Sequence, residues 1–208
     1  MVERQIRARD VQDPRVLQAM HKVPRHEFVN PHQYDQAYED HPLPIGEGQT
    51  ISQPYIVALM AELLSLPENA KVLEIGTGSG YEAAVLAELA GEVYTVEINE
   101  KLAAGAEKTL TRLGYRNVHI KHGDGYSGWI EQAPFDGIVV AAAPERVPAP
   151  LIGQLKEGKK LVIPLGHYPN QTLFVLRKSK NKIEEKAIIP VSFVPMTGLA
   201  GGESKKTL

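Results

Sequence analysis

The chain of 208 residues contains no cysteine. This absence excludes disulfide bonds, thiolate catalysis and zinc sites built on cysteine. It is compatible with a cytoplasmic protein, and the cytoplasm is the location that we expect. No apolar run approaches the roughly 20 residues of a membrane-spanning helix. Because no apolar stretch follows the charged residues of the segment Met1 to Arg7, the sequence also predicts no signal peptide.

Neither sign of charge dominates the chain, which has 23 Lys and Arg, 25 Asp and Glu, and a formal net charge of −2. A balance of this kind gives no general attraction to nucleic acid or to a membrane, so we expect neither as a partner. The histidines near the N-terminus, His21, His26, His32 and His41, match no spacing of metal ligands. We therefore predict no metal site, and the oligomeric state stays open.

The strongest functional signal is the segment from Val72 to Gly80. An apolar run up to Ile75 is followed by a turn with glycines at positions 76, 78 and 80, and then by a helical pattern. The apolar run is typical of a strand that is buried on both faces. Glycine lets a ligand approach the backbone closely, and the first N–H groups of a helix point toward such a ligand. The segment predicts a nucleotide-like ligand beside Gly76, Gly78 and Gly80.

Two acidic residues near this turn indicate which ligand binds. The glycine spacing is G-x-G-x-G, whereas dinucleotide-binding sites have G-x-G-x-x-G. Glu97 ends the next apolar segment, where a carboxylate can accept hydrogen bonds from both hydroxyls of a ribose. With Glu74, two residues before the first glycine, it places negative charge beside the ligand. That charge suits a cation, such as the sulfonium of S-adenosylmethionine, better than a pyrophosphate.

Apolar and helical segments alternate after Pro67, and this alternation predicts an α/β fold with a mostly parallel sheet and helices on both faces. We expect one domain over 1–208, with a helical and loop lid over 1–66, a cofactor-binding core over 67–166, and C-terminal strands and a tail over 167–208. Strands are expected over 71–75, 92–97, 117–121, 136–141 and 159–164, helices over 80–90, 100–113, 126–131 and 148–156, and an antiparallel edge pair over 172–178 and 186–194.

Three polar residues outside the glycine turn are further candidates. Asp124 fits a turn between two glycines, and its place after the third strand also lets it accept from the adenine amine. Ser52 fits the N-cap of a helix that has Pro54 in its first turn. Alternatively, Thr50 and Ser52 offer hydroxyl groups to a bound carboxylate at the same helix start. The residues alone leave both interpretations of Ser52 open.

These motifs resemble those of the protein-L-isoaspartate O-methyltransferase family over nearly the whole chain. Three stretches are similar to its S-adenosylmethionine motifs and are shared with the wider superfamily: Val72 to Tyr81, Gly123 to Gly125, and Leu155 to Gly166. Four others are more specific to the family: Val23 to Val29, Gly48 to Pro54, Pro134 to Asp136 with Ala142 to Pro144, and Val191 to Gly198. The resemblance implies a Rossmann-like fold of S-adenosylmethionine-dependent methyltransferases.

The resemblance also implies an activity, namely methyl transfer from S-adenosyl-L-methionine to the free α-carboxylate of L-isoaspartyl residues in damaged proteins and peptides. The products would be S-adenosyl-L-homocysteine and a methyl ester that starts repair through a succinimide. Ser52 corresponds to the active-site residue of the family. The positions that match its cofactor contacts are Thr50, Ile51, Ser52, Glu97, Ile98, Asp124, Gly125 and Thr197. Some members have Ala-Pro-His after this serine, but here Gln53-Pro54-Tyr55 follows, so no role of a histidine carries over.

The chemistry of such a substrate agrees with the residues. An α-carboxylate has a pKa of roughly 3.5 and is ionised at neutral pH, so it can attack a sulfonium methyl group without a general base. Our hypothesis is that the Ser52 hydroxyl, with Thr50, holds this carboxylate by charge-assisted hydrogen bonds. The cleft for the peptide is expected at Pro44 to Gly46, Ala142 to Pro144, and Leu165-Gly166.

Three alternatives remain at this point. The first is an S-adenosylmethionine-dependent methyltransferase of another carboxylate, a small molecule or RNA. The near-neutral charge and the missing Asn/Asp-Pro-Pro-Tyr/Phe motif argue against a nucleic-acid substrate. The second is a nicotinamide-dependent dehydrogenase, which the glycine spacing disfavours. The third is a non-catalytic binding module on the same fold, which the intact Gly76, Glu97 and Asp124 disfavour.

Overall fold

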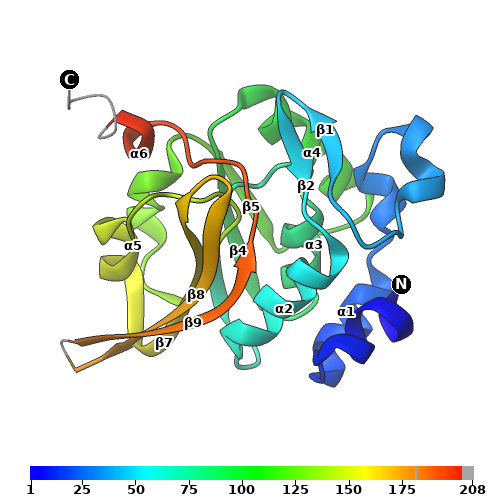
Figure 1. Cartoon of the computed structure of the whole chain (residues 1–208). Helices are drawn as coiled ribbons and strands as arrows, with labels where there is room; N and C mark the ends of the chain where they lie inside the picture. The colour runs from blue at the N-terminus through cyan, green and yellow to red at the C-terminus, as the bar shows by residue number, and fades with distance from the viewer. Residues whose placement is uncertain (181, 203–208) are drawn as a thin grey trace.

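A central sheet of seven strands organises the chain, in the order β5-β4-β3-β6-β7-β8-β9. The structure is a computed structural model that describes residues 1–180 and 182–202. Five strands are parallel to one another, namely β3 (Lys71–Ile75), β4 (Glu92–Glu97), β5 (Val118–His122), β6 (Phe135–Val140) and β7 (Leu155–His167). The last two, β8 (Asn170–Ser179) and β9 (Lys182–Val191), form an antiparallel edge (Figure 1). The predicted α/β fold with an antiparallel edge is confirmed.

Both faces of the sheet are covered. Val72 and Leu73 are both fully buried but join different apolar clusters, because successive strand residues point to opposite faces. The cluster on the Val72 side includes residues of α1 (Pro14–Lys22), α2 (Pro54–Leu64), α3 (Tyr81–Ala87) and α4 (Glu100–Arg112). The cluster on the Leu73 side includes Leu151 of α5 (Ala149–Gln154) and Met196 of the C-terminal segment.

The segment before the core contains short helices and one β-hairpin. A π-helical turn η1 (Val2–Ile6) and the 3-10 turns η2 (Arg7–Arg9), η3 (Arg25–Phe28) and η4 (Pro31–Gln36) precede the antiparallel pair β1 (Leu43–Gly46) and β2 (Gln49–Ile51). The sequence predicted no strand here, because three or four residues that include Pro44 and glycines show no alternation of apolar and polar positions.

The start of α2 corrects the expectation for Ser52. The N-cap is Gln53, which makes no capping hydrogen bond with its side chain, and Pro54 occupies the first turn. The serine therefore lies one residue before the cap, in the loop between β2 and α2. By contrast, Asp13 caps α1, and its side chain accepts a hydrogen bond of 2.8 Å from Arg15 N.

Two other boundaries differ from the prediction. The helix expected over 126–131 is two 3-10 turns, η5 (Gly125–Ser127) and η6 (Ile130–Gln132). Gly128 has a positive φ of 64° and lies against the side chain of Gln154, which bonds the backbone on both sides of the break. A short helix that the sequence did not predict, α6 (Leu199–Gly202), follows the two edge strands, and residues 203–208 of the predicted C-terminal tail lie outside the described residues.

The order of the strands determines where a ligand can bind. The chain runs outward from β3 through β4 to β5 and then returns to β6 on the other side of β3. Such a reversal leaves a crevice at the carboxyl ends of the strands. The glycine turn follows β3 at this point. No helix among the described residues combines the length and the apolarity that are needed to cross a bilayer.

Candidate active site

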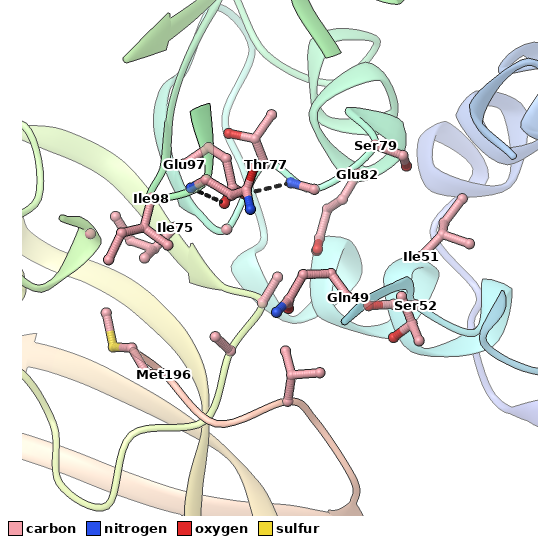
Figure 2. A pocket seen from close by; sticks show the side chains of 18 of the residues that line it. Gln49, Ile51, Ser52, Ile75, Thr77, Ser79, Glu82, Glu97, Ile98 and Met196 are labelled. Atoms are coloured by element: carbon pink, nitrogen blue, oxygen red, sulfur yellow. Dashed lines mark hydrogen bonds between the residues drawn. The ribbon is translucent and has the colours of Figure 1, made fainter. Parts of the chain in front are cut away.

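A cavity of about 260 Å³ lies at the carboxyl ends of β3, β4 and β6. Its walls come from the glycine turn, the end of β4, the residues that follow β6, the segment from β2 into α2, and the C-terminal segment around Met196 (Figure 2). Nine of the predicted site residues line it: Thr50, Ile51, Ser52, Gly76, Gly78, Glu97, Ile98, Gly125 and Thr197. Residues far apart in the sequence therefore meet at the predicted edge of the sheet.

Glu97 is fixed in this cavity by two backbone groups. Its Oε2 accepts a hydrogen bond of 2.8 Å from Gly78 N, and its Oε1 accepts one of 2.9 Å from Asn99 N. Each carboxylate oxygen can accept more than one hydrogen bond, so acceptor capacity remains toward the cavity. This geometry fits the predicted role of Glu97 as the acceptor for ribose hydroxyls.

The third glycine of the turn has a packing role. Gly80 has a positive φ of 89°, and a Cβ there would lie 3.1 Å from Leu110 Cδ1 and 3.3 Å from Ala106 Cβ of α4. Gly80 is not part of the cavity wall. It lets α3 start close to α4, and so acts on the site through the position of the helix.

Glu74 does not lie beside the ligand as predicted. Its side chain is fully buried behind β3 and does not line the cavity. Burial, with Glu82 nearby, raises the pKa of Glu74 well above its usual range. Because successive residues of a strand face opposite ways, Ile75 reaches the cavity, whereas Glu74 points to the face of the sheet that α3 covers, near Glu82. The cavity wall therefore does not include Glu74 among the predicted cofactor contacts.

Asp124 also departs from its predicted place, because its carboxylate binds backbone groups of the protein. Oδ1 accepts from Tyr126 N at 2.9 Å, and Oδ2 accepts from Leu199 N at 2.7 Å. The next residue, Gly125, lines the cavity, but Asp124 does not. Asp124 thus fastens the C-terminal segment that brings Met196 and Thr197 to the cavity.

The sequence interpretation missed Glu82. This residue lies in the first turn of α3, and in Figure 2 its side chain points into the cavity. It is 7% exposed, and its Oε1 has no hydrogen-bond partner among the described residues. Burial raises the pKa of Glu82 to about 8. Its position two residues after the last glycine of the turn is the signal that could have identified it.

A second cavity, of about 440 Å³, adjoins the first. Its walls include Arg9, Gln53, Ile56 and the segment 189–194, and we call it the groove. Thr50, Ser52, Ala141 and Val194 line both the groove and the first cavity. The Ser52 hydroxyl makes no hydrogen bond within the described part of the chain and lies at the junction of the two spaces.

The groove differs from the predicted peptide cleft. Of the residues expected there, Ala142 lines the first cavity, and Ile45 and Gly46 line a separate hollow that also includes Gly78. The others line neither the first cavity nor the groove, namely Pro44, Ala143, Pro144, Leu165 and Gly166. The open surface beside Ser52 instead faces the end of β9. The cleft was predicted from residues at the ends of the parallel strands, but the antiparallel edge, which the pattern did not place relative to Ser52, supplies the wall.

Arg9 is held in place at the groove. Its Nη1 lies 2.6 Å from Asp40 Oδ2, and its guanidinium carbon lies 3.7 Å above the centre of the Tyr55 ring. Asp40 also accepts hydrogen bonds from Gln53 Nε2 at 2.7 Å and from Tyr55 N at 3.2 Å. Tyr55, at the position where some members have histidine, thus supports a fixed cation beside Ser52.

The chain matches known proteins over most of its length. The family model for protein-L-isoaspartate(D-aspartate) O-methyltransferase matches residues 1–201. A relative in Gloeobacter violaceus, named protein-L-isoaspartate O-methyltransferase, is 57% identical over 198 residues, which cover 95% of this chain and 97% of the relative. A Shewanella sediminis relative, protein-L-isoaspartate O-methyltransferase 2, is 55% identical over 201 residues, or 96% of this chain and 82% of its own length.

Two solved structures are similar as well. One is named protein-L-isoaspartate O-methyltransferase and is 32% identical, with a TM-score of 0.86 over 92% of this chain and 63% of its own. The other, from Plasmodium falciparum, was assigned to the same activity and was solved in complex with S-adenosyl-L-homocysteine. It is 27% identical, with a TM-score of 0.79 over 92% of this chain and 94% of its own.

Proposed function

The chain belongs to the protein-L-isoaspartate(D-aspartate) O-methyltransferase family, and we propose that it transfers the methyl group of S-adenosyl-L-methionine to the free α-carboxylate of L-isoaspartyl residues in damaged proteins and peptides. One observation carries this proposal for the site. Ser52 and Thr50 line both the first cavity and the groove. The first cavity accommodates the cofactor, the groove accommodates the peptide, and the two hydroxyls lie where both meet.

The first cavity has the chemical profile that the cofactor needs. Apolar side chains at one end, among them Ile98 and Met196, suit a flat adenine ring, and Glu97 offers acceptors for a ribose. The opposite end is polar and contains Gln49 and Glu82 (Figure 2). The cofactor supplies an electrophilic methyl group on a positively charged sulfur.

The serine acts by position, since the reaction requires no proton transfer. The substrate carboxylate is already ionised, with a pKa of roughly 3.5 for an α-carboxyl group. Its oxygen forms the new bond to the methyl carbon while the electron pair of the carbon–sulfur bond stays on sulfur. The Ser52 hydroxyl donates a hydrogen bond that holds the carboxylate in line with the breaking bond, with Thr50 as a second donor. Ser52 is the residue that we assign to catalysis.

The groove is suited to an extended peptide. Its walls include Pro42, Ile56 and Phe193, which offer apolar contacts, while Arg9 provides a fixed positive charge. The segment 189–194 begins with the last residues of the edge strand β9 and leads to Val194 at the junction. A polypeptide lying along this wall brings one carboxylate to Ser52 without entering the cofactor cavity.

The outcome of the reaction is repair. The carbonyl carbon of the methyl ester is more electrophilic than that of the carboxylate, and methoxide can leave from it. The neighbouring backbone nitrogen therefore attacks this carbon, methanol is released, and a succinimide closes without help from the protein. Hydrolysis of that ring returns part of the material to normal aspartyl linkage.

Further parts of the prediction from sequence stay proposals. The division into a lid over 1–66, a core over 67–166 and a C-terminal part within one domain agrees with the apolar cluster that joins Leu17 of α1 to Val162 of β7 and Leu173 of β8. The cytoplasmic location and the lack of a nucleic-acid partner rest on the sequence alone, and the number of subunits stays open.

Two synthetic peptides that differ only in one L-isoaspartyl or L-aspartyl residue test the proposed function. Each is incubated with the protein and radiolabelled S-adenosyl-L-methionine, and base-labile methyl ester is counted. We expect label in the isoaspartyl peptide alone. Equal labelling of both peptides, or of neither while the cofactor still binds, would contradict the proposed substrate and favour methylation of another carboxylate.

A further inference from the structure

Glu82 lines the cavity, but the proposed methyl transfer gives its carboxyl group no role. Its carboxyl group is more than nine-tenths buried, yet one oxygen lacks a hydrogen-bond partner among the described residues and the side chain points into the cavity (Figure 2). A buried polar group without a partner is costly, so such a group in a native site calls for a ligand or another explanation. The cavity itself offers the place for that ligand.

The rest of the cavity indicates which part of the cofactor lies at Glu82. Ile98 and Met196 form one end, and Glu97 stands between this end and Glu82 (Figure 2). An adenine at the apolar end and a ribose at Glu97 leave the amino-acid part of the cofactor for the Glu82 end. That part carries an ammonium group, which donates hydrogen bonds, and a carboxylate group, which accepts them.

We propose that the Glu82 carboxylate binds the α-ammonium group of the cofactor's amino-acid part. This assignment rests on the proposed function, because it takes S-adenosylmethionine as the occupant of the cavity. A carboxylate side chain pairs with the ammonium group and repels the cofactor carboxylate, so it also fixes how the amino-acid part is turned. Glu82 is thus a binding residue for the cofactor and takes no part in bond making.

The surroundings of Glu82 couple ligand binding to the release of a proton. Glu74 and Glu97 are acidic groups that face this region, Tyr81 precedes Glu82, and the guanidinium of Arg25 lies over the Tyr81 ring. Burial among them raises the pKa of Glu82 to about 8, so the free protein holds a proton there at pH 7. An ammonium ligand stabilises the ionised form. Binding therefore releases this proton.

The first test compares two ligands that differ only in the part that Glu82 is proposed to hold. S-Adenosyl-L-homocysteine has the ammonium group, whereas 5′-methylthioadenosine has the adenosine and the sulfur without the amino acid. Binding is measured by calorimetry to the wild type and to Glu82→Gln, which keeps the shape of the side chain. We expect Glu82→Gln to lower the affinity for S-adenosyl-L-homocysteine by about ten- to a hundredfold, the usual range for the loss of a hydrogen bond to a charged group.

The second ligand reports on the folded cavity. The affinity for 5′-methylthioadenosine should change by less than about twofold, because this ligand lacks the group that Glu82 is proposed to contact. An equal loss for both ligands, or no loss for either, would overturn the assignment. If the wild type bound neither ligand, the cofactor assignment itself would fail, and this result is distinct from a failure at Glu82 alone.

The proton provides the second test. Calorimetry of S-adenosyl-L-homocysteine at pH 7 in buffers of different ionisation enthalpy gives the number of protons released. We expect close to one proton for the wild type and a clear reduction in Glu82→Gln. Release by the wild type should disappear as the pH rises above the pKa of Glu82 of about 8. If binding released no proton, Glu82 would stay protonated and donate to the cofactor carboxylate, which contradicts the proposal.

Discussion

The carboxylate of Glu97, at the last position of β4, accepts a hydrogen bond of 2.8 Å from the backbone N–H of Gly78 in the turn after β3. The same carboxylate accepts from Asn99 N at 2.9 Å, so it is held from two sides. One side chain therefore aligns the glycine turn with the neighbouring strand, and the acceptor that we propose for the ribose is held in place before any ligand arrives. Such preorganisation lowers the ordering cost of binding.

Glu97→Gln should lower the affinity for both S-adenosyl-L-homocysteine and 5′-methylthioadenosine, because both ligands carry the ribose. We expect a loss of roughly tenfold or more for each, since an amide replaces one charged acceptor by a donor. Calorimetric titration with both ligands checks this expected loss. The exposed Glu100→Gln, at the start of α4, is the control. Selective loss of one ligand would show that Glu97 does not hold the ribose.

Ser52→Ala should slow methyl transfer to the isoaspartyl peptide by about ten- to a hundredfold, the range for a hydrogen bond to a charged group. Binding of S-adenosyl-L-homocysteine should change far less, because the hydroxyl is assigned to the substrate carboxylate. Initial rates and calorimetry are compared with Ser127→Ala, an exposed serine outside both cavities. Unchanged turnover in Ser52→Ala would remove this residue from the mechanism.

Arg9→Gln should raise the KM for the peptide by several fold and leave the affinity for S-adenosyl-L-homocysteine unchanged. The guanidinium lines the groove and not the cofactor cavity, and its pairing with Asp40 holds it beside Gln53 and Tyr55. Arg7→Gln is the matched control, because Arg7 lies in the same short turn but pairs with Glu3, away from the groove. Similar effects of both variants would argue against a role of Arg9 in peptide binding.

Gly125→Ala should destabilise the protein by about 1–3 kcal/mol, the usual cost of overpacking a core. An added Cβ would collide with Ile75 Cγ2, and both residues line the cavity, so the affinity for S-adenosyl-L-homocysteine should fall too. In Gly105→Ala, within α4, the Cβ meets no atom within 4 Å. The free energy of unfolding of that variant should rise by about 0.5–1 kcal/mol, because alanine has a higher helix propensity than glycine. Urea unfolding of both variants checks the opposite signs.

Glu82→Gln should stabilise the ligand-free protein more at pH 8.5 than at pH 5. Because the pKa of Glu82 is about 8 in the folded chain, above the value of roughly 4.3 for an exposed glutamate, the folded state binds more protons between these values. Its contribution to stability is therefore present at low pH and is lost as the pH rises through this window. The amide does not titrate.

Thermal unfolding at the two pH values, with the exposed Glu107→Gln as the control, measures this difference. A melting temperature that rises by the same amount at both pH values would show that removing the charge of Glu82 is not the cause.

The sequence by itself determined the strands of the central sheet and the place of the site, but not the hairpin of β1 and β2. The expected strands over 71–75 and 92–97 match β3 and β4, and the alternation of segments predicted the parallel sheet. This success has a local cause: burial on both faces requires a continuous apolar run, and the turn after it requires glycine where φ is positive, at Gly76, Gly78 and Gly80. Glu97 could be placed because it directly ends a strand.

Only the tertiary structure decided which polar groups meet at the site. Asp124 bonds Leu199, 75 positions later, and Arg9 meets Tyr55 beside Ser52, pairings that no local pattern contains. Glu74 and Glu82 illustrate the same point, because each lies two residues from a glycine of the turn in the sequence. The strand directs Glu74 to the buried face that α3 covers, outside the cavity wall, whereas the first turn of α3 directs Glu82 into the cavity. The direction of a side chain depends on the packing of its element, which forms only when the whole chain has folded.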